Sequence, residues 1–474
     1  MAPPLPRSTK LWYGLGQAAQ GIKDQAFGYF LLFYYTQVVG LSGWLAGQAV
    51  LIALVFDALS DPIAGVFSDR LHSRWGRRHP FMYAAALPVA VCFYFTFAPP
   101  SGLGQAGLFA WLTLFAVLTR LMLTLFFVPH LALGAELSAD YEERTRIVAI
   151  QHVFSVGGAA AGGALGLLVF MRPTAAYADG QLNPAAYAPF ALSLAVGIFA
   201  TILLSAWRTH WRIPFLPQPQ PASQAGHALG AMLDGVREAF RIRSFRALFL
   251  GTLLVYTAWG VTTSLGLHLG TYFWRATTDQ LFLWGVANYT GTFLGLAYWP
   301  REVSRLDKKP VFIRGMAAYA VFLSGAAFAK LAGLWPAAGS PADIPLFIFT
   351  TGFLAHFALA ATMVTGRSMM ADVTDEDELR HGRRREGIFF GAVSFSAKAF
   401  FGFGSQIAGV IVGLVGLEPR AKPDEVSAEV ARGLGLSLGL SILFLAGLSL
   451  AFFSRYDISR ARQAAVRTEL DRRG

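Results

Sequence analysis

Long apolar stretches alternate along the chain with short clusters of charged residues. The apolar stretches include residues 27–39, 44–56, 84–98, 108–119, 190–206 and 434–453. A helix needs about 20 mostly apolar residues to cross the hydrocarbon core of a bilayer, so these stretches, extended at their ends, predict spanning helices. Their number, their length and their content of glycine, alanine and phenylalanine favour membrane helices over buried strands.

The pattern predicts an all-α membrane protein with twelve transmembrane helices. We expect them near 11–38, 45–68, 81–99, 108–133, 147–171, 187–207, 246–274, 280–299, 311–335, 344–370, 386–416 and 429–453. A connection at 208–245 contains the Pro/Gln/Ser stretch PFLPQPQPASQAG, which predicts a linker. The expected organisation is an N-terminal six-helix half at 1–207, this linker, a C-terminal half at 246–453 and a tail at 454–474. Two parallel six-helix halves are typical of membrane carriers.

The charge distribution predicts the orientation in the membrane. Only 14% of residues are charged, against about a quarter in soluble proteins, and the mean hydropathy is +0.48. Lys and Arg gather in every second connection, near 70–78, 144–146, 208–246, 301–309 and 380–385, and in the tail from 455. This positive-inside pattern places both termini in the cytoplasm. Contact with anionic lipid then accounts for the net charge of +11, and we expect no nucleic-acid partner.

Six of the charged residues inside predicted helices are singled out as candidates. They are Lys23, Asp24, Asp57, Asp61, Arg120 and Lys398. A charge at the centre of a bilayer costs about 2.5–3.5 kcal/mol on insertion scales, so each is a functional candidate. The three cations balance the three anions, which predicts a shared polar cavity, lined by the first, second, fourth, fifth, seventh and eleventh helices.

Asp57 and Asp61 form the sharpest candidate site. In VFDALSDPIAG they stand four residues apart, so both face one side of a helix, about 6 Å apart along its axis. Ser60 lies on the same side, and Pro62 removes one backbone hydrogen bond. Carboxylates with hydroxyls suit a sodium ion, and two close carboxylates can also share a proton. The alternative is a pair of salt bridges that only lock helices together.

The loop after the second predicted helix, GVFSDRLHSRWGRRHP, resembles a loop of the major facilitator superfamily. The matching residues are Gly65, Asp69, Arg70, Gly76, Arg77 and Arg78. Gly65 would let helices pack closely, and Asp69 could hold an arginine or a helix N-terminus in one conformational state. We therefore expect a gating role, the alternative being a basic loop that only fixes topology. A similar loop, WPREVSRLDKKP, follows the eighth helix.

Several blocks in both halves resemble the glycoside–pentoside–hexuronide:cation symporters of that superfamily. They are KLWYGLG with YYTQVVGLS, FDALSDPIAGVFSDRLHSRWGRRHPF, VPHLALGAELSADYEERTR and MMADVTDEDELRHGRRREGIFFGAVSFSAKAF. The resemblance implies a major-facilitator fold, an inner-membrane location and a melibiose permease-like symporter. It would import a sugar- or glycoside-type solute with sodium or a proton by alternating access. It also implies that Asp57, Ser60, Asp61 and Thr124 bind the cation, with Lys398 close by. Asp372, Arg384, Arg385 and Glu386 would belong to a closing network.

The departures from the family pattern concern the substrate. The helix 4 carboxylate that melibiose-type carriers share between cation and sugar is replaced by Phe127. Leu131 replaces the sugar-stacking tryptophan, and His152 replaces the sugar-binding arginine. The family's Lys–Asp pair appears as Lys23–Asp24, one turn late in the sequence. Arg120, on the same face as Phe127, is hypothesised to contact substrate or Asp57. Tyr256 and Trp259 could stack on a sugar face. We count all of these except Leu131, together with Lys398, as candidate substrate-binding residues.

Three alternatives remain at this point. Phe127 and Leu131 would suit a lysophospholipid or another amphiphile, which a branch of the same family carries. Loss of coupling at an altered cation site would leave an uncoupled sugar uniporter. A membrane enzyme would need a nucleophile with a base, or a metal motif, and the sequence contains neither pattern. We expect no enzyme activity, no cofactor, no metal beyond the coupling Na⁺, and a monomer.

Two patterns concern packing and surface charge. The glycine-rich runs at 157–166 and 402–413 predict close helix packing. The acidic run at 375–378 predicts a solvated charge network.

Overall fold

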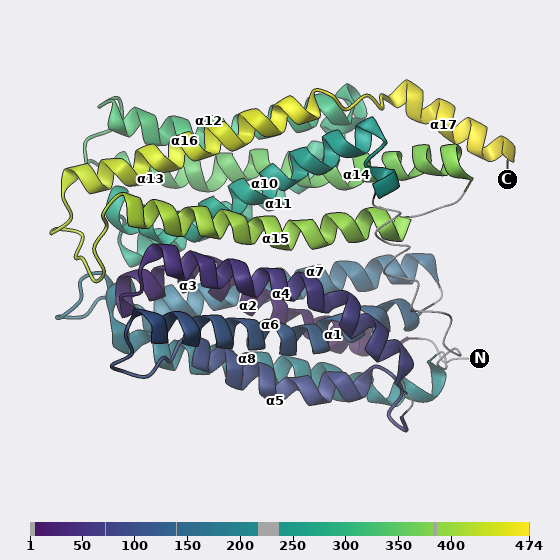
Figure 1. The fold of residues 1–474 in the computed structure, drawn as a ribbon, viewed down its shortest axis with the longest axis horizontal. Coiled ribbons are helices and arrows are strands. Elements are labelled where there is room, and N and C mark those ends of the chain that lie inside the picture. The colour runs from purple at the N-terminus through teal and green to yellow at the C-terminus, as the bar shows by residue number, and fades with distance from the viewer. Residues whose placement is uncertain (1–4, 72, 139, 217–236, 383–385, 474) are drawn as a thin grey trace.

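The structure is a computed structural model, and it describes residues 5–71, 73–138, 140–216, 237–382 and 386–473. Long helices run side by side in one bundle, and both chain ends lie at the same end of it (Figure 1). We call this the terminal end, and the other the opposite end. The sequence stretches 217–236 and 383–385 lie outside the described residues, so most of the predicted linker stretch and Arg384 and Arg385 are not placed.

Within the described residues, the first half contains six long helical segments. Its first segment comprises α1 (Arg7–Leu15), α2 (Gln17–Gln25), η1 (Ala26–Phe30), α3 (Leu31–Phe33) and η2 (Tyr34–Val39), the two η pieces being π-helical. There follow α4 (Gly43–Arg70), α5 (His79–Thr96), α6 (Gln105–Glu136), α7 (Tyr141–Ala164) with η3 (Leu165–Phe170), and α8 (Pro184–Thr209). We call the segment 7–39 the first helix below.

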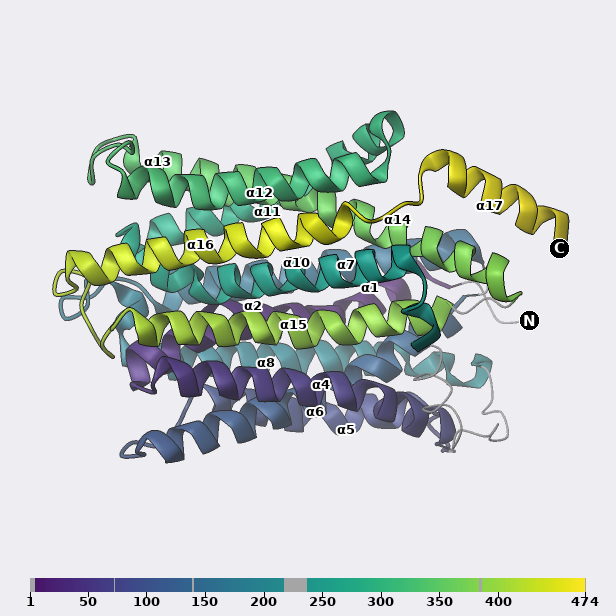
Figure 2. The same cartoon turned by 45° about the horizontal axis from the view of Figure 1, so that its top comes forward.

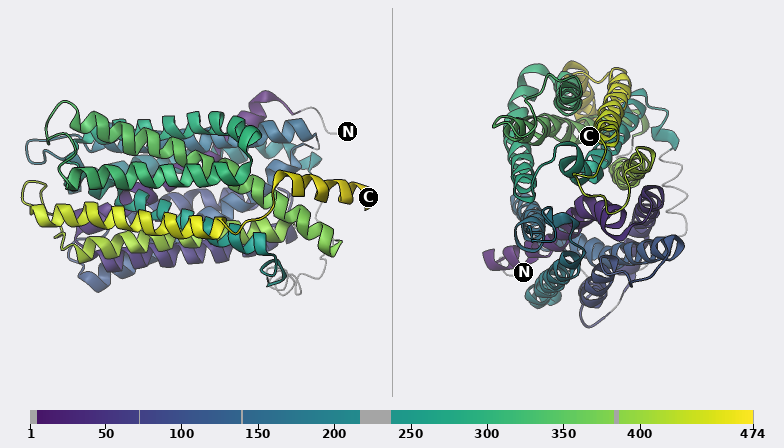
Figure 3. Two further views of the ribbon diagram at one scale, coloured as in Figure 1. Left: turned by 90° about the horizontal axis from the view of Figure 1, so that it is seen from above. Right: turned by 90° about the vertical axis from the view of Figure 1, so that its left-hand side faces the viewer.

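The second half repeats this layout. It contains α10 (Arg243–His268) with η7 (Leu269–Phe273), α11 (Thr278–Leu306) and α12 (Lys308–Leu331). Next come α13 (Asp343–Phe347), η8 (Ile348–Leu354) and α14 (Ala355–His381) as one continuous segment, then α15 (Glu386–Leu414) and α16 (Ala428–Phe453). A separate helix, α17 (Arg460–Arg473), follows. Seen end-on, the helices of the two halves form two groups (Figure 3).

Each of the twelve predicted helices is present. Ten helices of the described residues are long and apolar enough to span a membrane by length and composition. The other two bundle segments are the first helix, which π-helical turns divide, and α11. The largest boundary difference is at α14, which continues to His381 and not 370, because its last turns carry charged residues that leave the apolar pattern.

Polar N-cap residues fix where several helices begin at the opposite end. Side-chain oxygens of Ser42, Asn183 and Ser427 accept backbone N–H groups at the starts of α4, α8 and α16. Thr277 and Gln280 form a reciprocal capping box at the start of α11. Such caps satisfy N–H groups that have no partner within the helix.

Glycines set the distance between α4 and α15, which run together along the boundary between the halves (Figure 2). A methyl group at Gly409 would lie 2.2 Å from the backbone oxygen of Gly43, so only glycine permits this approach. Within the first half, a methyl at Gly158 would lie 2.4 Å from the oxygen of Ala18. The predicted close packing at both glycine-rich runs is confirmed.

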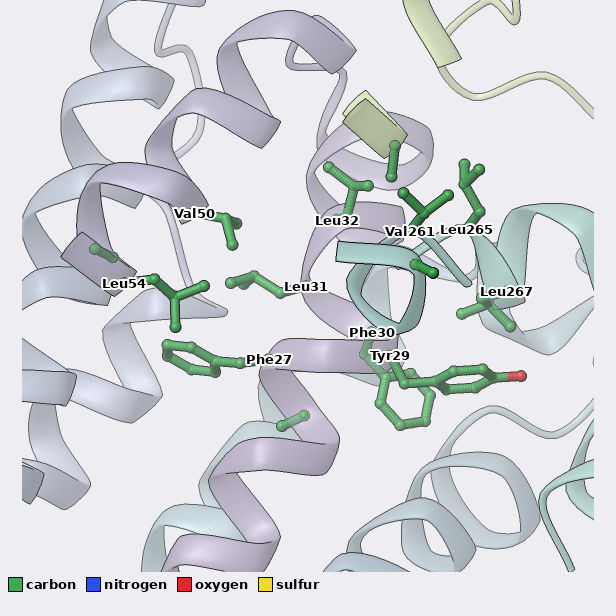
Figure 4. Close-up of a cluster of buried hydrophobic side chains, with 14 of the residues drawn as sticks. Phe27, Tyr29, Phe30, Leu31, Leu32, Val50, Leu54, Val261, Leu265 and Leu267 are labelled. Carbon is green, nitrogen blue, oxygen red and sulfur yellow. The ribbon is translucent and has the colours of Figure 1, made fainter. Parts of the chain in front are cut away.

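Apolar side chains seal the centre of the bundle where the first helix meets α4 and α10. Figure 4 shows part of this cluster, in which Phe27 faces Leu54 while Tyr29 and Phe30 lie on the other side of the first helix. These side chains are buried, with Phe30 fully so. The cluster joins the two halves over part of their contact.

Hydrogen bonds join the halves at the opposite end. Tyr272 donates to Gln37 at 3.0 Å, and Gln181 contacts Thr271 at 3.0 Å and Thr278 at 2.7 Å. Arg420, between α15 and α16, donates from its backbone and guanidinium to the carbonyls of residues 37, 38 and 39 at 3.0–3.2 Å. The bundle is therefore closed at the opposite end.

Candidate functional site

A cavity of about 470 Å³ lies between the two halves. That volume falls within the range of about 300–1,000 Å³ typical of small-molecule sites. Its charged lining consists of Lys23 and Asp24 from the first helix, Asp57 from α4, Arg120 from α6 and Lys398 from α15. The structure thus brings five of the six predicted membrane charges to one chamber.

Asp57 and Asp61 share a hydroxyl partner. Thr124 Oγ1, on α6, lies 3.0 Å from Asp57 Oδ1 and 3.1 Å from Asp61 Oδ1, and 3.4 Å from the hydroxyl of Ser60. Both carboxylates therefore turn to one side of α4, as their spacing predicts. Their Oδ1 atoms, with the two hydroxyls, form a compact group of oxygens.

The other oxygen of each carboxylate faces a cation. Lys398 Nζ lies 2.6 Å from Asp61 Oδ2 and 3.2 Å from Asp57 Oδ2. Arg120 Nη1 lies 3.4 Å from Asp57 Oδ2, and its guanidinium carbon lies 5.2 Å from the centre of the Phe27 ring. Asp57 is 6% exposed, so its charge depends on these two partners. The hypothesised contact between Arg120 and Asp57 is present.

Lys23 and Asp24 pair with each other at the cavity wall. The Lys23 side chain is 3% exposed and that of Asp24 is 54% exposed. Gln20 donates to Asp24 Oδ2 at 2.9 Å. This pair therefore offers the chamber an accessible carboxylate held beside a buried cation.

The remaining predicted substrate residues divide into two groups. Tyr256 and Trp259 line the cavity from α10, and their ring centres lie 6.4 Å apart. Phe127 and His152 do not belong to the cavity lining, and His152 is exposed. Ser60, Asp61 and Thr124 lie behind Asp57, also outside the lining.

The structure adds a wall that the sequence reasoning missed. Trp284, Asn288 and Tyr289 of α11 line the cavity, as does His356 of α14. Asn288 Nδ2 lies 2.8 Å from His356 Nε2, and Tyr289 donates to Gln25 of the first helix at 3.0 Å. The sequence signal for this wall was the occurrence of polar groups within apolar helices. The sequence does not identify the hydrogen-bond partner of a single histidine or asparagine.

The loop motif lies at the terminal end. Arg78 Nη2 contacts Asp69 at 2.6 Å and Glu136 of α6 at 2.8 Å, and Arg77 contacts Glu136 at 2.8 Å. Asp69 thus holds an arginine, as expected, and Glu136 is a partner that the sequence did not indicate. Gly76 adopts φ +70°, which favours glycine.

One detail of the predicted gate differs from the expectation. A methyl at Gly65 would meet Val128 at 3.7 Å, an ordinary van der Waals distance, so close packing does not require glycine there. Arg70 is the last residue of α4. The role of both residues in gating stays a prediction.

The second half has its own polar network at the terminal end. Lys308 Nζ lies 2.6 Å from Asp372 Oδ2, and the Tyr456 hydroxyl donates to the same oxygen at 3.4 Å. Glu386 begins α15. The contact between Lys308 and Asp372 has its counterpart in the Arg78–Glu136 pair of the first half, since in each half a cation at the start of one helix (α5 or α12) contacts a carboxylate on the next long helix (α6 or α14).

The prediction of a solvated acidic run is wrong for two of its members. Glu376 and Asp377 are 3% and 0% exposed. Glu376 pairs with Arg380 at 2.6 Å and with Arg462 of α17 at 2.5 Å. The tail helix covers this face of α14, and the sequence pattern of α14 alone could not show that.

Comparisons with known proteins agree with this architecture. A family described as "MFS/sugar transport protein" matches residues 12–460. The "Putative glycoside/cation symporter YagG" of Escherichia coli (strain K12) is 26% identical, over 97% of this chain and 94% of its own. The "Isoprimeverose transporter" of Lactiplantibacillus pentosus is 25% identical, over 86% of this chain and 80% of its own.

Two further comparisons bear on the fold and on the rival substrate class. A crystal structure of a mutant of the nucleoside transporter NupG matches with a TM-score of 0.64 at 15% identity, over 94% of this chain and 98% of that one. "Sodium-dependent lysophosphatidylcholine symporter 1-A" of Danio rerio is 28% identical, but over only 35% of this chain and 31% of its own.

The fold and its central chamber define a membrane transporter of the major facilitator type. The chain belongs to the family of MFS/sugar transport proteins. It is a multi-pass membrane protein and a transporter rather than an enzyme, and the resemblance to the glycoside–pentoside–hexuronide:cation symporters holds at the level of the family.

Proposed function

We propose that the protein is a cation-coupled symporter that imports a sugar- or glycoside-type solute across the inner membrane by alternating access. Relatives that match most of the chain carry the names of a glycoside/cation symporter and an isoprimeverose transporter. The cavity supports a polar solute, because its lining offers five charged groups beside aromatic rings. The positive-inside pattern supports a terminal end that faces the cytoplasm. Closure at the opposite end then corresponds to an inward-facing state.

One observation carries the coupling proposal. Asp57 and Asp61 each turn one oxygen to the shared hydroxyl of Thr124 and the other to Lys398. The two Oδ1 atoms and the hydroxyls of Thr124 and Ser60 are hard oxygen ligands, which suit Na⁺. A proton could instead neutralise one carboxylate of the pair. In either case the arriving cation competes with Lys398 for the same carboxylates.

Competition with Lys398 links the cation to the substrate. Lys398 lines the cavity and contacts both carboxylates, so binding of a cation at the carboxylates releases Lys398 toward the chamber. A solute hydroxyl or carboxylate can then accept from the released ammonium. Reorientation with an unpaired charge in the site is costly, which favours movement of the fully loaded carrier.

Transport by reconstituted vesicles tests the proposal. Vesicles under an imposed Na⁺ or H⁺ gradient should accumulate labelled isoprimeverose or methyl glycosides above the outside concentration. Asp57→Asn and Asp61→Asn should each reduce that accumulation at least tenfold. Asp279→Asn, which changes an exposed carboxylate in the first turn of α11, is the matched control and should leave it unchanged. Accumulation by both α4 variants would reject coupling at this pair.

The same vesicles separate the rivals. Equilibration of a saccharide without response to either gradient would indicate a uniporter. Uptake of lysophosphatidylcholine with no saccharide uptake would indicate the amphiphile carrier. Lys23, Asp24 and Arg120 in the lining favour a polar solute, because an acyl chain offers a charged group no hydrogen bond.

A further inference from the structure

The wall of the cavity formed by α11 and α14 contains a polar pair that the proposed cation mechanism does not use. His356 is 4% exposed, and its Nδ1 lies 2.9 Å from the carbonyl oxygen of Gly352 and 3.2 Å from that of Thr351. A carbonyl oxygen only accepts hydrogen bonds, so Nδ1 carries the proton. Among the described residues its hydrogen-bond partners include no carboxylate to balance a charge, so the ring is neutral.

The neutral ring fixes the orientation of the neighbouring amide. With its proton on Nδ1, His356 Nε2 is an acceptor, and Asn288 Nδ2 at 2.8 Å must donate to it. That bond uses one of the two side-chain N–H groups of Asn288. Its second side-chain N–H and its side-chain carbonyl oxygen have no partner among the described residues, and Asn288 is half-buried in the cavity lining.

A second group, on the first helix where it packs against this wall, points to a polar ligand. Tyr29 is 6% exposed and lines the cavity, and its buried hydroxyl has no hydrogen-bond partner among the described residues. Its ring stacks on Trp284, with centres 6.1 Å apart and planes 19° apart. The Trp284 N–H donates to Thr351 at 2.9 Å, which fixes the position of the indole. A buried hydroxyl without a partner is costly unless a ligand or water satisfies it.

We propose that Asn288 is a specificity-determining residue that binds two neighbouring hydroxyls of the solute, with the Tyr29 hydroxyl contributing a third polar contact. A primary amide offers one donor and one acceptor side by side, which matches a vicinal pair of hydroxyls that each donate and accept. His356 is the positioning residue, since its fixed tautomer orients the amide. This inference rests on the proposed saccharide transport and assigns the second wall of that site.

The polar groups of the cavity belong to two different halves of the molecule. Asn288 and His356 belong to the second half, whereas Lys23, Asp24 and Arg120 belong to the first. A solute held by both walls spans the boundary between the halves. A solute of the correct length and hydroxyl pattern contacts both walls, so its binding stabilises the closed arrangement of the two halves. A solute bound to one wall would not stabilise that arrangement.

The test measures saccharide binding by purified protein with isothermal titration calorimetry. The probes are isoprimeverose, methyl β-D-glucopyranoside, methyl β-D-galactopyranoside and their monodeoxy analogues. Asn288→Leu keeps the side-chain shape and removes both polar functions, and we expect at least a tenfold rise in the Kd of the best-bound probe. Thr290→Val, on the exposed side of the same helix, is the matched control and should leave the Kd unchanged.

The deoxy analogues separate recognition from a structural effect. Removal of one hydroxyl of the recognised pair should weaken binding to the unsubstituted protein and should cost little further in Asn288→Leu, because the partner is already absent. In the vesicle uptake assay, His356→Ala should raise the KM for the saccharide more than it lowers kcat. His356→Gln retains an acceptor for Asn288, so it should restore much of the lost apparent affinity. An equal deoxy penalty in both proteins, or an unchanged Kd in Asn288→Leu, would overturn the inference alone. Failure of the unsubstituted protein to bind any of these probes would overturn the saccharide proposal and this inference together.

Discussion

Lys398 Nζ of α15 lies 2.6 Å from Asp61 Oδ2 of α4, although the two residues are 337 positions apart in the sequence. The same ammonium lies 3.2 Å from Asp57 Oδ2. The bond joins the two halves through a carboxylate of the proposed cation site. A cation that displaces Lys398 would therefore loosen one connection between the halves and fill the site at the same time.

The first prediction concerns this pair. Lys398→Gln leaves two neighbouring carboxylates without their shared cation, which should cost about 1–3 kcal/mol of stability. Adding Asp61→Asn should restore much of the lost unfolding temperature, because the double variant removes the excess charge. Thermal unfolding in detergent measures both effects. Lys422→Gln, in an exposed pair with Glu425, is the control and should have no effect. Additive losses in the double variant would contradict the pairing.

Arg120 should weaken the affinity for the coupling cation. Its guanidinium lies 3.4 Å from Asp57, so its positive charge opposes a second cation at that carboxylate. Arg120→Gln should lower the half-saturating cation concentration about tenfold, which corresponds to about 1.4 kcal/mol. Uptake measured over a series of Na⁺ concentrations and external pH values gives this quantity. A higher half-saturating concentration would show instead that Arg120 supports the cation site.

The close approach of α4 and α15 should depend on one glycine and not on its neighbour one turn away. Gly409→Ala places a methyl 2.2 Å from the backbone of Gly43, whereas nothing lies within 4 Å of a methyl at Gly413. Overpacking of this kind costs about 1–3 kcal/mol. We expect a clearly lower unfolding temperature for Gly409→Ala and an unchanged one for Gly413→Ala. Equal effects of the two variants would mean that helix propensity, and not the interface, decides the outcome.

Arg420 should hold the opposite end closed. It donates to the last carbonyls of the first helix, where the helix dipole favours a cation. Arg420→Ala should increase the distance between fluorophores at residues 102 and 338 in a Cys92→Ser background, measured by single-molecule energy transfer. Arg172→Ala is the control, since Arg172 lies at the same end but donates within its own helix. An unchanged distance distribution in Arg420→Ala would exclude a latch at this position.

The tail helix α17 should release from α14 when Arg462, near its start, is replaced. Arg462 contacts Glu376 at 2.5 Å and Asp457 at 3.1 Å. Arg462→Ala should increase the mobility of a spin label at Thr468, in the same Cys92→Ser background. Arg472→Ala, which changes an exposed arginine of the same helix, should not. Equal mobility in all three proteins would contradict docking through Arg462.

The pH dependence of this docking follows from Asp457. Burial raises the pKa of Asp457, but the hydrogen bond from Ser244 and the charge of Arg462 outweigh burial and hold the pKa below its ordinary value. A carboxylate with a lowered pKa stabilises the folded arrangement above the unfolded pKa of about 3.9, and that contribution is lost as the pH falls through the lower, folded value. The spin label should therefore stay immobile from about pH 5 to 8 and become mobile only in stronger acid.

The local sequence pattern was sufficient to predict the helices and to identify the candidate charged residues. Each apolar run became a helix because apolar length and the need to satisfy backbone groups leave few other structures in a membrane. Asp57 and Asp61 turned to one side because a spacing of four residues is close to one helical turn. Lys23, Arg120 and Lys398 stood out because a charge in an apolar run is costly wherever the helix is packed.

Contacts between distant segments were decided only by the tertiary structure. The local sequence pattern does not distinguish Asn288 and His356 from single polar residues that hydrogen-bond within their own helix. Their hydrogen bond to each other depends on how α11 packs against α14. Glu376 is buried because α17 folds back onto a face of α14 that looks solvated in the sequence. Sequence periodicity specifies which face of a helix must be covered, but the identity of the covering partner depends on how the helices pack, and that arrangement decides which charges meet.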